Sequence, residues 1–173
     1  ITARREMGFL VPSKGYEYAT IKGHKCAIIV GDDLSRERDF DQSVETVISI
    51  NARKYGKGTM TYRYEMMRNL AFVESKNLVL VNQVGGSTDI VYDGTSGALN
   101  SRGELVLMMK NFEEDFQIFD TKASARPISI PSTYNDRTRL VYEAARCGLR
   151  DFFRKNGYRK ASIGLSGGID SAV

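Results

Sequence analysis

The segment Ser166–Ser171 carries the residue types with the clearest chemistry in this chain, reading Ser-Gly-Gly-Ile-Asp-Ser. It follows an apolar run over 161–165, which predicts a buried strand. A glycine-rich turn after a strand presents backbone N–H groups that surround phosphate oxygens, and adjacent glycines let the backbone approach a pyrophosphate closely. Asp170 is suited to orienting the loop or helping to hold a metal. We therefore expect a phosphate site made by Gly164, Leu165, Ser166, Gly167, Gly168, Ile169, Asp170 and Ser171.

A long helix over 137–156 is expected to lead into this loop. Asn135 or Asp136 can cap its start, and Gly157 suits the left-handed position that follows its last turn. The apolar face predicted for this helix consists of Leu140/Val141, Ala144/Ala145, Leu149 and Phe152/Phe153. Two prolines among serines and threonines at 121–135 are typical of a linker or an extended arm, so a second unit is expected to begin at 136.

The first 120 residues predict an α/β unit. Inner strands are expected over 26–30, 46–50 and 78–82, where short apolar runs are typical of strands buried on both faces. A helix is expected over 59–75. The remaining expectations are strands over 16–22, 90–92, 104–109 and 116–119, a short helix over 41–47, and turns at 23–24, 32–33, 84–87 and 100–103.

Composition narrows the class of protein. The 173 residues are 42% hydrophobic and 27% charged, with a net charge of +4 that is too diffuse to favour nucleic acid. There is no apolar run of membrane-spanning length and no signal peptide, so the prediction is a cytoplasmic protein without a membrane partner. The single histidine excludes a multi-histidine metal site. The start at Ile1 and the end within a phosphate loop suggest an internal fragment of a longer polypeptide.

The loop and its preceding helix resemble the N-type ATP pyrophosphatases. Residues 149–157, followed by a strand into the loop, look like the entry to the NAD synthetase domains of that superfamily. Upstream, Val81–Gly86 and Asp89–Ser96 are similar to the late part of the nitrilase-type glutaminase domain of glutamine-dependent NAD synthetases. Both halves of the chain therefore resemble one family of enzymes.

The resemblance implies a fold and a domain organisation. Residues 1–120 would be the second half of a nitrilase-like α-β-β-α sandwich, and residues 121–135 a linker. Residues 136–173 would begin the parallel, doubly wound ATP-binding domain of a NAD synthetase. Nitrilase-like domains usually pair, so a homo-oligomer is expected.

The resemblance also implies a ligase reaction. ATP adenylates the carboxylate of deamido-NAD and releases pyrophosphate, and ammonia then displaces AMP to give the amide of NAD. Mg²⁺ is expected to neutralise the phosphates. The family's ammonia comes from glutamine through a cysteine thioester.

Two departures from the family pattern concern that glutamine reaction. Gly31 occupies the position expected for the nucleophilic cysteine, and Cys26 should point to the opposite face of its strand. Arg53 and Lys54 replace a Ser-Pro pair at the glutamine pocket. Tyr55, Asp89 and Ser96 are the residues that would remain from this pocket, with simple turn chemistry as the alternative for Asp89 and Ser96.

Three functional hypotheses therefore stay open. The chain is part of a NAD synthetase that uses glutamine, or its first domain is a degenerate scaffold on a synthetase that uses free ammonia. The third hypothesis is another N-type ATP pyrophosphatase that amidates or thiolates a different substrate.

Overall fold

The computed structural model describes residues 16–31, 40–121 and 126–172. The acidic turn predicted at 32–33 lies outside the described residues, as does the start of the chain. The described elements are β1 (Glu17–Ile21), β2 (His24–Val30), β3 (Thr46–Asn51), α2 (Thr59–Glu74), β4 (Asn77–Asn82), β5 (Val84–Ser87), β6 (Ile90–Asp93), β7 (Gly97–Leu99), β8 (Leu105–Met108), η2 (Ser132–Tyr134), α3 (Arg137–Asn156) and α4 (Ile169–Ala172). None of the described helices has the length and apolar character needed to span a membrane.

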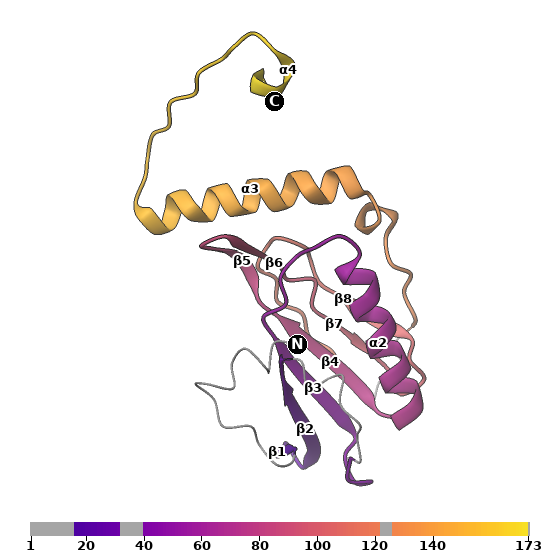
Figure 1. Cartoon of the computed structure of the whole chain (residues 1–173). Coiled ribbons are helices and arrows are strands. Elements are labelled where there is room, and N and C mark those ends of the chain that lie inside the picture. Colours follow the sequence, from indigo (N-terminus) through magenta and orange to yellow (C-terminus); the bar gives the residue numbers. More distant parts are fainter. Residues whose placement is uncertain (1–15, 32–39, 122–125, 173) are drawn as a thin grey trace.

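A mixed six-stranded sheet forms the body of the molecule, in the order β1-β2-β3-β4-β7-β8 (Figure 1). β2, β3 and β4 run parallel to one another, whereas β1 and the pair β7–β8 add antiparallel strands at the two edges. The parallel arrangement brings the carboxyl ends of three strands to one edge of the sheet, which is where α/β proteins commonly build sites. β5 and β6 form a separate hairpin beyond that edge.

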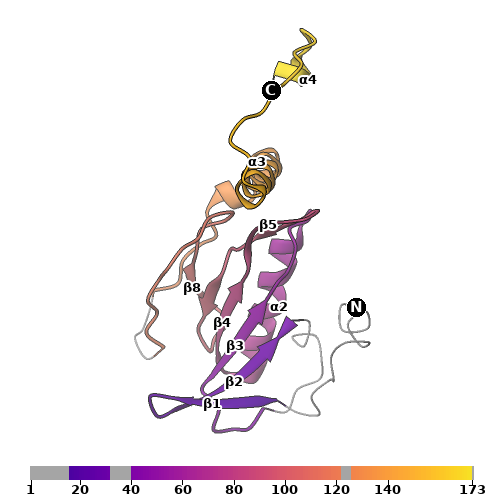
Figure 2. The same cartoon turned by 90° about the vertical axis from the view of Figure 1, so that its left-hand side faces the viewer.

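The helix α2 covers one face of the sheet (Figure 2). Its buried side chains, among them Met67 and Leu70, pack on strand residues such as Ile29, Val47 and Leu78. The residues on the other face become exposed toward the carboxyl ends of the strands, with Val30 at 64%. The prediction that the strand at 26–30 is buried on both faces therefore holds only at its start: Cys26 and Ala27, on opposite faces, are both buried, whereas Ile28 is half-buried and Val30 is exposed.

Several local predictions were also wrong. The segment 41–47 holds a turn stabilised by Asp41, which accepts hydrogen bonds from the backbone N and hydroxyl of Ser43, and no helix forms there. Residues 84–87 form β5 instead of a turn, and residues 116–119 are not a strand. The helices over 59–75 and 137–156 and the strand at 90–92 are confirmed.

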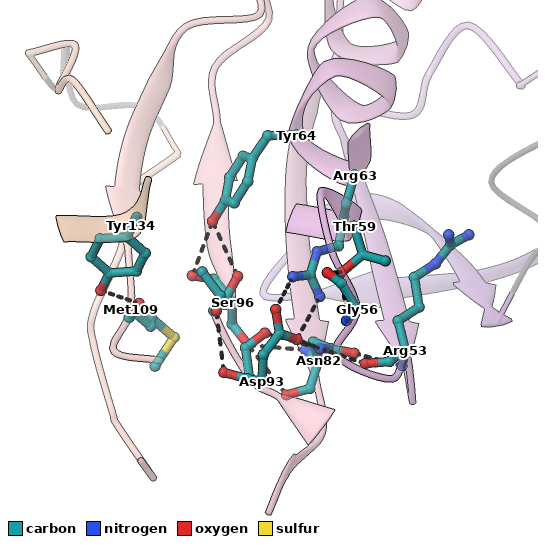
Figure 3. Close-up of polar contacts among 12 residues, drawn as sticks. Arg53, Gly56, Thr59, Arg63, Tyr64, Asn82, Asp93, Ser96, Met109 and Tyr134 are labelled. Carbon is teal, nitrogen blue, oxygen red and sulfur yellow. Dashed lines mark hydrogen bonds and ion pairs between the residues drawn. The ribbon is translucent and has the colours of Figure 1, made fainter. Parts of the chain in front are cut away.

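Residues 126–131 run along β8 as an extended arm that leads into η2. The backbone N of Ile128 donates to the carbonyl of Leu105 at 2.8 Å, and the Tyr134 hydroxyl donates to the carbonyl of Met109 at 3.2 Å (Figure 3). The arm then enters α3, which lies across the end of the sheet next to β5.

Asp136 is the N-cap of α3 and accepts a hydrogen bond from the backbone N of Arg139 at 3.0 Å. Replacing Asp136 by alanine is expected to lower the free energy of unfolding by about 1 kcal/mol, because one N–H of the first turn loses its partner. Urea denaturation followed by circular dichroism measures the change. Asn135→Ala, one residue earlier, is the matched control, and an equal loss in both variants would contradict the assignment of the cap.

Candidate functional site

The predicted phosphate loop is a closed turn held by its own serines. The hydroxyls of Ser166 and Ser171 lie 2.9 Å apart, and the Ser171 hydroxyl also donates to the carbonyl of Gly168 at 2.9 Å. The Ser166 hydroxyl in turn accepts a hydrogen bond from the backbone N of Gly168. Gly167 has a φ of 84°, which an L residue adopts only with strain. The serines therefore hold the turn that the glycine makes possible.

The flanks of this loop differ from the prediction. Residues 161–165 form no strand, and Leu165 is 71% exposed because no other described strand runs beside it. Ile169 and Asp170 begin the short helix α4. In Figure 1 the loop and α4 stand away from the sheet, at the end of an extended segment that leaves α3.

Gly31 follows the last residue of β2 at the carboxyl edge of the sheet. Its φ is 67°, and a Cβ built there would meet no atom of the described residues within 4 Å. The described residues therefore leave room for a side chain, but this left-handed backbone conformation disfavours a residue that has a Cβ. Gly31 itself offers no nucleophile.

Cys26 is a buried core residue and no substitute nucleophile. It is 5% exposed, and its thiol lies 3.7 Å from the carbonyl of His24. Burial, together with the nearby carboxylate of Glu45, raises the pKa of the Cys26 thiol. Because the thiolate is the reactive form, this environment keeps the sulfur unreactive.

A buried polar network lies where β4 ends, and Asn82 is its centre (Figure 3). Its side-chain amide donates to Asp93 at 2.9 Å and to the carbonyl of Gly94 at 3.0 Å, and its oxygen accepts from the backbone N of Arg53 at 2.8 Å. Asn82 thereby fixes the loop after β3 against the loop after β6. Hydrogen bonds from Asn82, rather than apolar contacts, therefore hold these two loops together at the carboxyl edge of the sheet.

An ion pair inside the protein completes the network. The guanidinium of Arg63 on α2 donates to both carboxylate oxygens of Asp93, at 3.1 and 2.6 Å, and both side chains are less than 5% exposed. The neighbouring Tyr64 donates to the carbonyl of Thr95 at 3.1 Å, and burial raises the pKa of this tyrosine. α2 is thus bonded to the same loop that Asn82 holds.

Tyr55, Asp89 and Ser96 occupy three different environments. The Tyr55 ring packs edge-on against Phe112, with centroids 5.2 Å apart. The Ser96 hydroxyl accepts a hydrogen bond from the backbone N of Asn82 at 2.9 Å. Asp89 is exposed in the turn between β5 and β6. Their assignment to a glutamine pocket stays a prediction.

Sequence reasoning missed Arg63, Asn82 and Asp93 as a group. One signal was available: Arg63 lies on the otherwise apolar face formed by Met60, Tyr64 and Met67. A charged residue at such a position requires a buried partner of opposite charge. The identity of that partner, thirty residues later in the chain, was not readable.

No family model matches the chain, but known proteins resemble it in sequence and in structure. A glutamine-dependent NAD(+) synthetase of Acinetobacter baylyi is 30% identical over 169 residues, covering 93% of this chain and 31% of the relative. The corresponding enzyme of Synechocystis is 30% identical over 175 residues, covering 91% and 31%. The chain thus spans about a third of the length of these relatives.

The solved structures agree with the sequence comparison. The glutamine-dependent NAD+ synthetase of Acinetobacter baumannii in complex with ADP has a TM-score of 0.78 and 28% identity, covering 96% of this chain and 33% of that one. A CN-hydrolase superfamily protein of Xanthomonas campestris shares the fold, with a TM-score of 0.57 and 15% identity. The match covers 95% of this chain and 58% of that protein. The mixed α/β fold therefore matches nitrilase-type proteins, and glutamine-dependent NAD(+) synthetases are homologues of about 90% of this chain, as the sequence resemblance predicted.

Proposed function

We propose that the protein carrying this chain is a NAD synthetase that amidates deamido-NAD at the expense of ATP. The carboxylate oxygen of deamido-NAD attacks the α-phosphorus of ATP, forming an acyl-adenylate while pyrophosphate leaves. Ammonia then attacks the acyl carbon, AMP leaves, and the amide loses a proton. The observation that carries the proposal is the loop at 166–171, which its serines close. The chain that contains it is homologous to glutamine-dependent NAD synthetases, one of which was solved in complex with ADP.

The loop residues suit the first of these steps. Its backbone N–H groups and the serine hydroxyls are donors for the charge that develops on the leaving pyrophosphate. Asp170, exposed in the first turn of α4, is the carboxylate that the loop offers to Mg²⁺, which is commonly held by one or two carboxylates together with substrate phosphates. The remainder of the ATP-binding domain would form the parallel sheet that residues 161–165 join as a strand.

One feature of the sheet supports the proposal that residues 1–120 are half of a nitrilase-like sandwich. On the sheet face that α2 leaves open, Val30, Ile50 and Val81 lie in one cross-strand row and are 64%, 44% and 47% exposed. An apolar row of this kind is suited to packing against a second sheet. We propose the α-β-β-α sandwich on this basis, within a cytoplasmic homo-oligomer.

Gly31 supports a second proposal about the nitrogen donor. Without a nucleophilic side chain at this strand end, no thioester can form there, and Cys26 is buried. We therefore propose that the nitrilase-like domain is a scaffold and that free ammonia is the donor. Use of glutamine remains the competing reading, supported by the homologous enzymes.

Nitrogen-donor assays test both proposals. The full-length protein, given ATP, Mg²⁺, deamido-NAD and ammonium chloride, is expected to form NAD and release AMP and pyrophosphate in equal amounts. Replacing ammonium by glutamine is expected to lower the rate to background. Glutamine turnover equal to ammonia turnover would contradict the scaffold proposal, and failure with every nitrogen donor would contradict the synthetase and favour a different amidated or thiolated substrate.

A further inference from the structure

Within the described part of the chain, the hydrogen bonds from α3 to the hairpin go to Gly86 on β5. The carboxylate of Asp151 accepts a hydrogen bond from the Gly86 backbone N at 2.8 Å, and the ammonium of Lys155 donates to the Gly86 carbonyl. Asp151 and Lys155 are four residues apart and so lie on one face of the helix. The backbone N–H and C=O of Gly86 therefore both bond to α3. On a free strand edge these two groups would be open to pairing with another strand.

Glycines allow this close approach. A Cβ on Gly86 would lie 3.0 Å from the Cα of Gly148 on α3, and a Cβ on Gly85 would lie 2.7 Å from a carboxylate oxygen of Asp151. Helix and strand backbones are thus nearly in contact, as the two views of α3 and β5 also show (Figures 1 and 2). Any side chain at these positions would separate them.

The contact also contains a buried charge. Asp151 is 1% exposed, and the guanidinium groups of Arg150 and Arg154 lie 3.1 and 3.4 Å from its second oxygen. Although burial opposes ionisation, the Gly86 N–H and Arg150 keep the pKa of Asp151 below its usual range. The side chain is therefore an anion at neutral pH, which strengthens its hydrogen bond to Gly86.

The latch, defined as Gly85, Gly86, Gly148, Asp151 and Lys155, joins the two candidate sites. On one side, β5 begins two residues after Asn82, the centre of the strand-edge network. On the other side, the C-cap of α3 is Gly157, nine residues before Ser166 at the start of the predicted phosphate loop. The position of α3 therefore fixes where the segment 158–165, which leads to the loop, begins.

We infer that Asp151 and Lys155 are positioning residues for the ATP reaction, acting by latching α3 to Gly86. This inference rests on the proposed synthetase function. Loss of the latch lets α3 shift against the hairpin, which displaces the loop from the ATP that it must hold in line. A displacement of about 1 Å costs on the order of 100-fold in rate in positioned reactions.

The test uses the full-length protein with saturating ammonium, so that glutamine chemistry does not contribute. Asp151→Ala is expected to lower kcat/KM for ATP about 10- to 100-fold. Asp151→Asn keeps an acceptor for the Gly86 N–H and is expected to retain most of the activity. Arg146→Ala, on the exposed side of α3, is the matched control and is expected to behave as wild type.

A double-variant cycle distinguishes the latch from a general loss of helix stability. Gly86→Ala separates helix and strand without removing a charge, so its effect on kcat/KM for ATP should not add to that of Asp151→Ala. Additive effects, or an Asp151→Ala variant with unchanged kcat and KM, would overturn the latch. If the wild-type protein forms no NAD, the result counts against the proposed function and not against the latch. Hydrogen exchange reports the contact independently of activity: the Gly86 amide is expected to exchange faster in Asp151→Ala than in wild type.

Discussion

Replacing Asp93 by alanine is expected to lower the free energy of unfolding by about 3–5 kcal/mol. The substitution leaves Arg63, which is 3% exposed, as a buried cation without its carboxylate. It also removes one of the acceptors of the Asn82 side-chain amide, so the network at the end of β4 loses its connections from Asp93 to Arg63 and to Asn82. Urea denaturation of wild type and variant measures the difference.

Two further variants separate charge from hydrogen bonding at this position. Asp93→Asn keeps an oxygen acceptor and should lose less stability than Asp93→Ala. Glu113→Ala breaks the exposed contact with Lys110, which is long at 3.7 Å, and should change stability little because solvent screens that pair. A loss below about 1 kcal/mol in Asp93→Ala would show that the buried pair contributes no more than a surface pair does.

Replacing Ser166 and Ser171 together by alanine is expected to lower the rate of NAD formation about 100- to 1000-fold. The two hydroxyls hold the turn through their mutual contact and through Gly168. In the proposed reaction they would also be donors for the leaving pyrophosphate. Pyrophosphate release in the presence of deamido-NAD and ATP is the direct measurement.

The same double variant should leave the stability of the sheet unchanged. The loop is exposed and lies outside the core formed by α2 and the strands. Ser162→Ala, in the exposed segment before the loop, is the matched control for loss of a hydroxyl. Full activity of the double variant would show that the backbone alone holds the phosphates and that the serines are dispensable.

Long elements with a strong local pattern were predictable. The helix over 137–156 has its cap at Asp136 and its left-handed end at Gly157, and both signals come from residues next to the helix. Its packing was only partly predictable. Leu149 and Phe152 were assigned to the apolar face but are 62% and 51% exposed, whereas the polar Asp151 is buried. The face of α3 that is buried is the one that contacts the β5–β6 hairpin, and hydropathy alone did not identify it.

Short elements depended on partners that local sequence does not name. Val84–Ser87 has turn composition, but Gly86 pairs with Val91 in the hairpin and bonds to α3, so the segment is a strand. Residues 161–165 have strand composition, yet no described strand lies beside them. A strand exists only where its backbone groups find partners, which is a property of the tertiary structure.

The sequence by itself determined three things: a serine- and glycine-rich loop at 166–171 of the kind predicted to bind phosphate, a glycine where a nucleophile was expected, and similarity to NAD synthetases. Spacing and residue type suffice for these because they concern groups within a few residues of one another. Only the tertiary structure decided that Arg63 meets Asp93 and that Asp151 meets Gly86. These pairs are 30 and 65 residues apart in the chain, and burial of their charges is favourable only when the fold brings both partners together.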